Sequence, residues 1–272
     1  MTESQQPMPP AMILCGGQGT RLREVTELLP KPMVPIGEQP IIWHIMRGYA
    51  AFGVKRFILC LGYKREEFID YFLNFHARST DITVRLGKDH GITYHGETFE
   101  ADWEVTLADT GIETMTGGRI LRASRYLKPE DREFFLTYGD GVSDLDIGEL
   151  LAFHRKNGKL LTLSAVHPDG RFGEMKFRGN LVEGFAEKPI SSSRYINGGF
   201  MVADREIVSR YLEGRPDCYF EARPMQEILK DRQLAALRHN GFWQCMDTPR
   251  EHKLLNDLWN SGSAPWTKHW QR

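Results

Sequence analysis

The sequence has few cysteines, no excess charge of either sign and no long apolar run. Its four cysteines lie far apart without a Cys-x-x-Cys pair, which argues against a disulfide scaffold or metal site and favours reduced thiols. Lysine and arginine number 35 against 36 acidic residues, so the overall charge attracts neither nucleic acid nor an anionic membrane. No apolar stretch approaches the length of a membrane-spanning helix. Any site for an anionic ligand must therefore be built locally.

The length and the rest of the composition are those of an ordinary globular protein. A chain of 272 residues with 41% hydrophobic and 26% charged residues can bury a substantial core in one large α/β domain. We expect a flexible tail over residues 1–9 and a single domain over residues 10–272. The tail lacks the basic and apolar regions of a signal peptide, so we expect a cytoplasmic protein.

A glycine-rich turn follows the first predicted strand, residues 11–15. Three glycines stand within four residues: Gly16, Gly17 and Gly19. Without Cβ atoms they let backbone N–H groups approach an anion closely, and Arg21 and Lys31 add positive charge nearby. The simpler alternative is a tight strand-to-helix turn with an exposed arginine. A Walker A loop is excluded by spacing, and Leu22 replaces the third glycine of a dinucleotide fingerprint. We therefore predict a triphosphate site.

Strand and helix patterns alternate along the first half of the chain. Residues 54–61 and 133–138 read as buried strands, and the apolar spacing predicts helices over residues 40–52 and 65–75. This alternation indicates a mainly parallel sheet covered by helices on both faces. The interval from residue 87 to residue 102 lacks a clear pattern and is expected to form an excursion or flap.

Two acids stand where predicted strands end. Asp140 lies between two glycines after residues 133–138, and Asp247 precedes a capping box formed by Thr248 and Glu251. Because ligands of parallel sheets bind at the carboxyl ends of strands, both acids are candidate Mg²⁺ ligands. An Asx turn or a helix cap is the alternative for Asp140, although Asp146 suits that role better.

Three weaker signals point to further anion or sugar contacts. Lys188 stands between a glutamate and a proline, which an exposed turn would also explain. Gly198, after Asn197, weakens a strand unless a ligand approaches its backbone. Thr116 and Arg119 open a helix whose N-terminus could receive an anion.

Together these motifs resemble the sugar-1-phosphate nucleotidylyltransferases, and their cytidylyltransferase branch in particular. The superfamily pattern is Gly16-Gly17-Gln18-Gly19-Thr20-Arg21-Leu22 with Lys31-Pro32-Met33. The branch is indicated by residues 43–46, 106–111 and 115–119. Further matches occur in family order at residues 137–142, 170–173, 187–189, 196–200 and 241–248. The resemblance implies a Rossmann-like, mainly parallel mixed sheet flanked by helices, with a small β extension. It also implies Mg²⁺ dependence and homo-oligomers that bring a neighbour's residues to the nucleotide.

The resemblance further implies transfer of a cytidylyl group from CTP to a sugar 1-phosphate, α-D-glucose 1-phosphate being favoured. The alternatives are dTTP or UTP as donor, another phosphate or phosphonate acceptor, or a non-catalytic nucleotide-sugar-binding regulator. A nucleotide-binding part would cover about residues 10–145 and a sugar-phosphate-binding part about residues 146–247. The C-terminal helix and tail would take residues 248–272.

The resemblance assigns roles residue by residue. It implies nucleotide contacts for Leu14, Gly16, Gly17, Gly19, Thr20, Arg21, Lys31, Thr116, Arg119, Tyr138, Gly139 and Asp140. Sugar-phosphate contacts are implied for Glu187, Lys188, Asn197 and Gly198. Arg21, Lys31 and Lys188 would be catalytic, and Asp140 and Asp247 would hold Mg²⁺. Leu29, Arg223 and residues 191–194 depart from the family pattern, which leaves the acceptor open.

Overall fold

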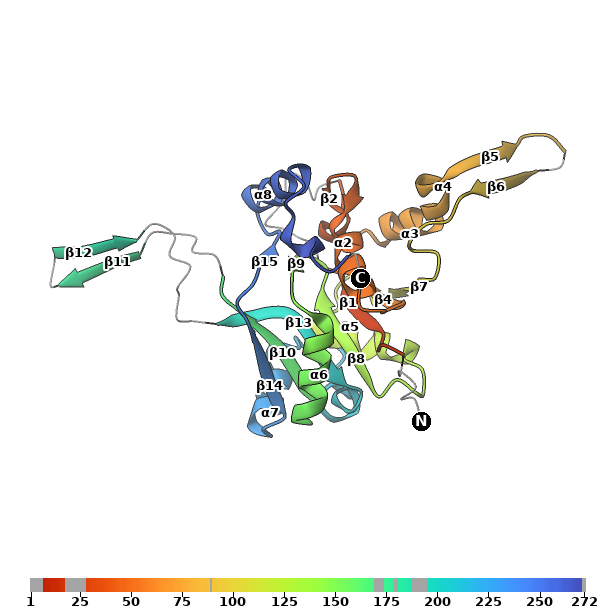
Figure 1. Ribbon diagram of the computed structural model, residues 1–272. Coiled ribbons are helices and arrows are strands. Elements are labelled where there is room, and N and C mark those ends of the chain that lie inside the picture. Colours follow the sequence, from red (N-terminus) through yellow and green to blue (C-terminus); the bar gives the residue numbers. More distant parts are fainter. Residues whose placement is uncertain are drawn as a thin grey trace, which may run out of the picture.

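Seven strands form the central sheet of the protein, for which we analysed a computed structural model (Figure 1). The structure describes residues 7–17, 28–88, 90–168, 174–178, 181–186 and 195–270. In spatial order the strands are β14 (Leu234–His239), β10 (Leu161–Val166), β13 (Ile196–Asp204), β8 (Glu133–Tyr138), β1 (Ala11–Leu14), β4 (Arg56–Leu61) and β7 (Glu104–Asp109). All neighbours pair in parallel except at β13, which is antiparallel to both β10 and β8. The predicted mixed, mainly parallel sheet is confirmed.

Two hydrophobic clusters cover the two faces of the sheet, because its strands alternate their side chains. On β1, Ile13 belongs to one cluster and Met12 to the other. The helices of the structure are α2 (Ile41–Ala50), α3 (Arg65–Leu73), α4 (Phe75–Ser79), α5 (Thr116–Ala123), α6 (Ile147–Asn157), α7 (Arg223–Lys230) and α8 (Pro249–Asn260). Shorter helical turns are η2 (Lys31–Met33), η3 (Ser124–Tyr126), η4 (Val208–Leu212) and η5 (Pro265–Thr267). Within the described residues, no helix is long and apolar enough to cross a membrane.

Local sequence signals account for several element ends. Pro40 precedes α2, and the side chain of Asp146 caps α6 by accepting from the Glu149 backbone N–H at 2.8 Å. Thr248 and Glu251 form the predicted capping box at the start of α8. Inside the predicted tail, Met8 packs partly buried against the core.

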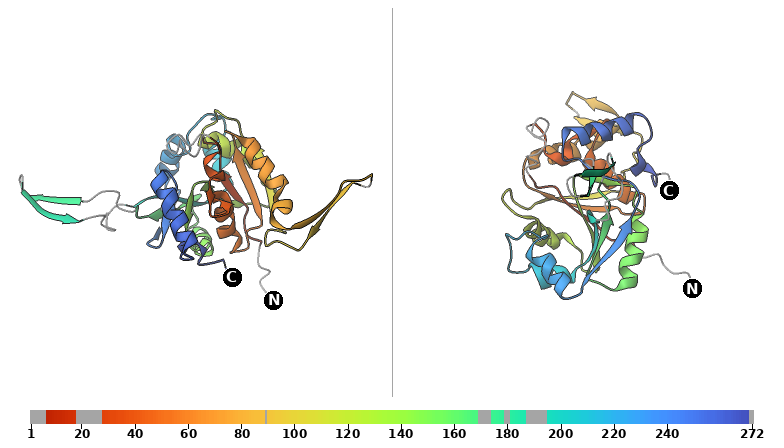
Figure 2. Two further views of the ribbon diagram at one scale, coloured as in Figure 1. Left: turned by 90° about the horizontal axis from the view of Figure 1, so that it is seen from above. Right: turned by 90° about the vertical axis from the view of Figure 1, so that its left-hand side faces the viewer.

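Four two-stranded pairs complete the structure. They are β2 (Pro35–Ile36) with β3 (Gln39–Pro40), β5 (Asp81–Arg85) with β6 (Gly91–His95), β9 (Gly141–Ser143) with β15 (Trp243–Cys245), and β11 (Glu174–Arg178) with β12 (Leu181–Ala186). Figure 2 shows the β5–β6 and β11–β12 hairpins extending outward in opposite directions. The expected flap over residues 87–102 is in part a regular strand, β6, which pairs with β5. One face of this hairpin exposes four apolar side chains, Ile82, Val84, Ile92 and Tyr94.

The order of the strands creates a crevice at one edge of the sheet. β1 lies between β4 and β8 and is parallel to both, so the chain leaves β1 at the point where the strand order reverses. In open α/β sheets this point, at the carboxyl ends of the strands, is where ligands bind.

Candidate functional site

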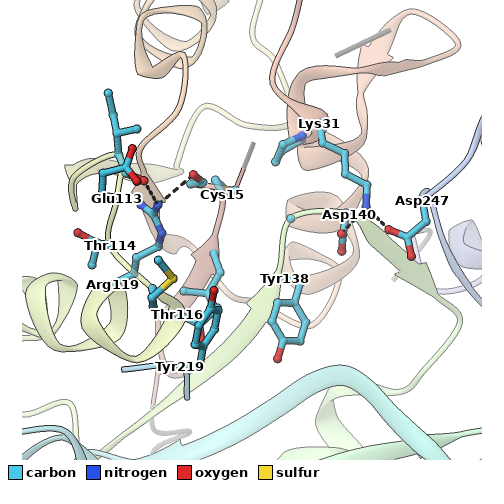
Figure 3. Close-up of a pocket in the computed structure, with 17 residues that line it drawn as sticks. Cys15, Lys31, Glu113, Thr114, Thr116, Arg119, Tyr138, Asp140, Tyr219 and Asp247 are labelled. Carbon is cyan, nitrogen blue, oxygen red and sulfur yellow. Dashed lines mark hydrogen bonds and ion pairs between the residues drawn. The ribbon is translucent and has the colours of Figure 1, made fainter. Parts of the chain in front are cut away.

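A pocket of about 450 Å³ opens at the carboxyl ends of β1 and β8 (Figure 3). Its walls include every described residue of the expected nucleotide-binding set: Leu14, Gly16, Gly17, Lys31, Thr116, Arg119, Tyr138, Gly139 and Asp140. The volume falls in the range typical of small-molecule sites. The remaining members of that set, Gly19, Thr20 and Arg21, lie outside the described residues, as do Glu187 and Lys188.

Lys31 lies between the two acids that were predicted as metal ligands. Its Nζ is 2.6 Å from Asp140 Oδ2 and 2.5 Å from Asp247 Oδ1 (Figure 3). The two carboxylate oxygens are therefore within about 5 Å of each other, the sum of those distances. The prolines on either side of Lys31 fix its backbone, and its side chain is only 11% exposed. Burial by itself would lower the pKa of Lys31, but the two carboxylates outweigh it and raise that pKa.

A short ribbon brings the two acids together although 107 positions separate them in the sequence. Asp140 stands between β8 and β9, and β9 pairs antiparallel with β15, which leads to Asp247. The backbone N–H of Met246 donates to the Asp140 carbonyl at 2.8 Å. Thr248 takes the capping role at α8, so the Asp247 carboxylate faces Lys31 instead of the helix.

Arg119 is buried on the other side of the pocket and holds three loop ends together. Its guanidinium donates hydrogen bonds of 2.8–3.0 Å to the carbonyls of Gly16, Leu61, Gly111 and Ile112 and to Thr110 Oγ1. These acceptors follow, or end, strands β1, β4 and β7. Arg119 is thus a fixed positive charge that clamps the loop after β1.

This clamp explains the first glycine of the turn. A Cβ added to Gly16 would lie 2.0 Å from Arg119 Nη1, far inside van der Waals contact. At Gly17 no described atom would meet an added Cβ within 4 Å. The need for glycine at position 16 therefore comes from the buried guanidinium.

Tyr138 and Thr116 share a partner that the sequence did not reveal. Glu221 accepts from Tyr138 Oη at 2.5 Å and from Thr116 Oγ1 at 2.6 Å. Burial, reinforced by the Glu221 carboxylate, raises the pKa of Tyr138. Residues 112–115 and Tyr219 also line the pocket without having been predicted. They belong to connecting loops whose sequences carry no periodic signal.

A smaller cavity of about 50 Å³ adjoins the pocket at Tyr138 and Asp140. Asn197 and Gly198, the described members of the expected sugar-phosphate set, line it. Asn197 Oδ1 accepts from the Gly199 N–H at 2.9 Å, and Trp243 Nε1 donates to the Gly198 carbonyl at 2.7 Å. The structure thus brings both residues beside the larger pocket.

Two of the three departures from the family pattern lie away from these cavities. Leu29 packs partly buried against the hydrophobic core. Arg223 is 75% exposed and its Nε donates to Glu227 Oε1, one turn further along α7. Residues 191–194 lie outside the described residues.

Asp140 and Asp247 suit a hard divalent cation, because such ions prefer oxygen donors. The two carboxylates also already bind one cation between them, the Lys31 ammonium. Cys245, Asp247 and Glu251 also lie near one another, with ligand atoms within 4.8 Å. Burial raises the pKa of the Cys245 thiol to about 12, however, and Glu251 Oε2 accepts two backbone N–H groups at the cap of α8. The cluster around Cys245 is therefore poorly suited to bind a metal.

Comparison with known proteins decides the family. The model of the nucleotidyl transferase family matches residues 10–246. The chain belongs to this family. It is 43% identical over 261 residues to a glucose-1-phosphate cytidylyltransferase of Salmonella typhimurium, covering 96% of this chain and 99% of that protein. It is 38% identical over 256 residues to a probable glucose-1-phosphate cytidylyltransferase of Bacillus subtilis, covering 94% and 98%.

Solved structures agree with this membership at the level of the fold. The crystal structure of HddC from Yersinia pseudotuberculosis matches with a TM-score of 0.63 at 24% sequence identity. The match covers 93% of this nucleotidyl transferase and 100% of the HddC chain. The fold predicted from the sequence resemblance is thereby confirmed.

Proposed function

We propose that the protein transfers the cytidylyl group of CTP to α-D-glucose 1-phosphate, releasing CDP-glucose and pyrophosphate. The observation that carries the proposal is the 43% identity to a glucose-1-phosphate cytidylyltransferase along nearly the full length of both chains. The pocket after β1 supports it, because its walls include every described residue expected to contact the nucleotide.

The reaction is a direct displacement at the α-phosphorus of CTP. An oxygen of the acceptor phosphate forms the new P–O bond while the bond from the α-phosphorus to the bridging oxygen breaks. Pyrophosphate leaves with that electron pair. The attacking phosphate is already ionised at neutral pH, so no general base is required. The barrier lies in bringing two polyanions together, and catalysis consists of positioning and charge neutralisation.

The chain supplies positive charge on both sides of the pocket. Lys31 lies beside the two acids, and Arg119 lies under the loop after β1. The backbone of Gly16 and Gly17 lines the space between, where phosphates would bind. We assign Arg21 to the triphosphate and Lys188 to the acceptor phosphate, which are proposals from the sequence.

Nucleotidyl transferases of this family generally depend on a divalent metal ion. We propose that the ion is Mg²⁺ and that Asp140 and Asp247 hold it. When bound, it supplies further neutralisation of phosphate charge. We also propose a cytoplasmic homo-oligomer. A two-stranded hairpin is marginally stable alone, and a subunit covering the apolar face of β5–β6 would stabilise it.

A substrate screen tests the assignment. Pyrophosphate release is measured with each of CTP, UTP, dTTP and GTP against several sugar 1-phosphates, and products are identified by mass spectrometry. The expected pair is CTP with α-D-glucose 1-phosphate. A faster reaction with dTTP or UTP, or with another acceptor, would replace the assignment within the same chemistry. Binding of nucleotides without turnover would favour a regulator instead.

The two acids are tested by Asp140→Asn. Loss of one charged group at such a centre costs about 2.7–4 kcal/mol of barrier, a fall of about 10²–10³-fold in turnover. Asp257→Asn is the matched control, because Asp257 is an exposed acid paired with Lys253 on α8. Turnover by Asp140→Asn close to that of the control would contradict the proposed role.

A further inference from the structure

Lys31 occupies the space that the predicted metal ligands enclose. Its ammonium lies 2.6 Å from Asp140 and 2.5 Å from Asp247, and it donates a charge-assisted hydrogen bond to each carboxylate. The carboxylates are themselves partly shielded, with side chains 33% and 23% exposed. The two acids are therefore already neutralised in part by a cation belonging to the chain.

The Lys31 ammonium and a divalent ion would compete for the same two carboxylates. Mg²⁺ binds carboxylate oxygens at about 2.0–2.1 Å, and the Lys31 nitrogen already lies within 2.6 Å of both acids, so an ion held by these acids would crowd the ammonium. Repulsion between the two cations adds to this steric conflict.

The side chain of Lys31 also borders the nucleotide pocket, which offers its ammonium a second position. Lys31 lines the nucleotide pocket as well as the gap between the acids, and its four-carbon stem carries a point charge through several rotatable bonds. A change of rotamer would carry the ammonium from the carboxylates toward the rest of the pocket.

We propose that Lys31 is an exchangeable counter-ion for the metal site. It neutralises Asp140 and Asp247 before substrates arrive, and a divalent ion displaces its ammonium into the nucleotide pocket. Metal binding thereby moves a positive charge onto the triphosphate, so metal and nucleotide bind cooperatively. This inference rests on the proposed function, because it takes the two acids as metal ligands.

Binding of Mn²⁺ to the nucleotide-free protein tests the exchange, with free Mn²⁺ measured by electron paramagnetic resonance. Lys31→Gln is expected to bind Mn²⁺ at least about tenfold more tightly than the wild type, because the competing charge beside the site is gone. Lys55→Gln is the matched control: it removes an equal charge from a side chain that is 61% exposed and paired with Asp102. It should leave Mn²⁺ affinity unchanged.

A second measurement uses the wild type and does not depend on the folding of a variant. Acetylation of Lys31 by an amine-reactive reagent, followed by mass spectrometry, should be slow without metal and increase several-fold when Mg²⁺ is added. Unchanged or weaker Mn²⁺ binding by Lys31→Gln, or labelling of Lys31 that does not respond to Mg²⁺, overturns the exchange. Neither result affects the proposed function, which fails instead if the wild type forms no CDP-glucose.

Discussion

Replacing Arg119 by methionine should weaken the fold as well as the site. The substitution removes the donor from five acceptors, three of them in fully buried hydrogen bonds: the carbonyls of Leu61 and Gly16, and Thr110 Oγ1. A hydrogen bond from a charged donor contributes about 1.5–3 kcal/mol. The Leu61 carbonyl still accepts from the Thr110 N–H and hydroxyl, and the Gly16 carbonyl still accepts from the Tyr63 N–H, so the acceptors are weakened but not left unpaired. Relief from burying the guanidinium offsets part of this cost. We therefore expect a loss of about 3–5 kcal/mol in the free energy of unfolding.

Urea denaturation at neutral pH measures the loss, and titration with CTP measures the nucleotide site. Arg119→Lys should fall between the methionine variant and the wild type, because an ammonium retains three donors. Arg125→Met is the control, since Arg125 is exposed and its Nη2 donates to its neighbour Tyr126. A stability of Arg119→Met within about 1 kcal/mol of that control would refute the clamp, because surface substitutions stay near ±0.5 kcal/mol.

Two further predictions concern the glycine turn and His44 in α2. Gly16→Ala should sharply weaken CTP binding, because the added Cβ would lie 2.0 Å from Arg119 Nη1. Gly17→Ala should bind CTP more tightly than Gly16→Ala does, and equal affinities of the two variants in a titration would contradict this. Burial lowers the pKa of His44 to about 4, and its Nδ1 accepts from Trp266 Nε1. Between about pH 6.5 and 4 the unfolded chain then binds more protons than the folded chain. The free energy of unfolding should therefore fall by about 3 kcal/mol as the pH is lowered over that range. Urea midpoints should show a shallower pH slope for His44→Gln, and an identical slope would exclude His44 as the cause.

The architecture was predictable because its strands and helices carry strong periodic signals. The first strand, the helix after Pro40 and the capping box at Thr248 all occur where the sequence placed them. Strand β14 was missed, because residues 234–239 are only partly buried and alternate weakly. Strand β6 of the hairpin β5–β6 was not predicted, since it is exposed and lacks an apolar alternation facing a core.

The site was predictable where residue type alone indicates chemistry. The two acids, the lysine and the glycines do meet at one edge of the sheet, although their functional roles are still predictions. The contacts of Arg119 could not be foreseen, because its five acceptors are four carbonyls and a hydroxyl from three separate loops. Glu221 was missed for a related reason, since only the folded chain brings it to Tyr138.

The ribbon that joins β9 to β15 has a consequence for a chain still emerging from the ribosome. Most of the central sheet, the glycine turn and Asp140 are all encoded before residue 205. Asp247 is held in place by β15, which can pair with β9 only after residue 245 has appeared. A nascent chain can therefore fold much of its sheet early, but it acquires its second acid only after β15 has followed the main sheet out of the ribosome.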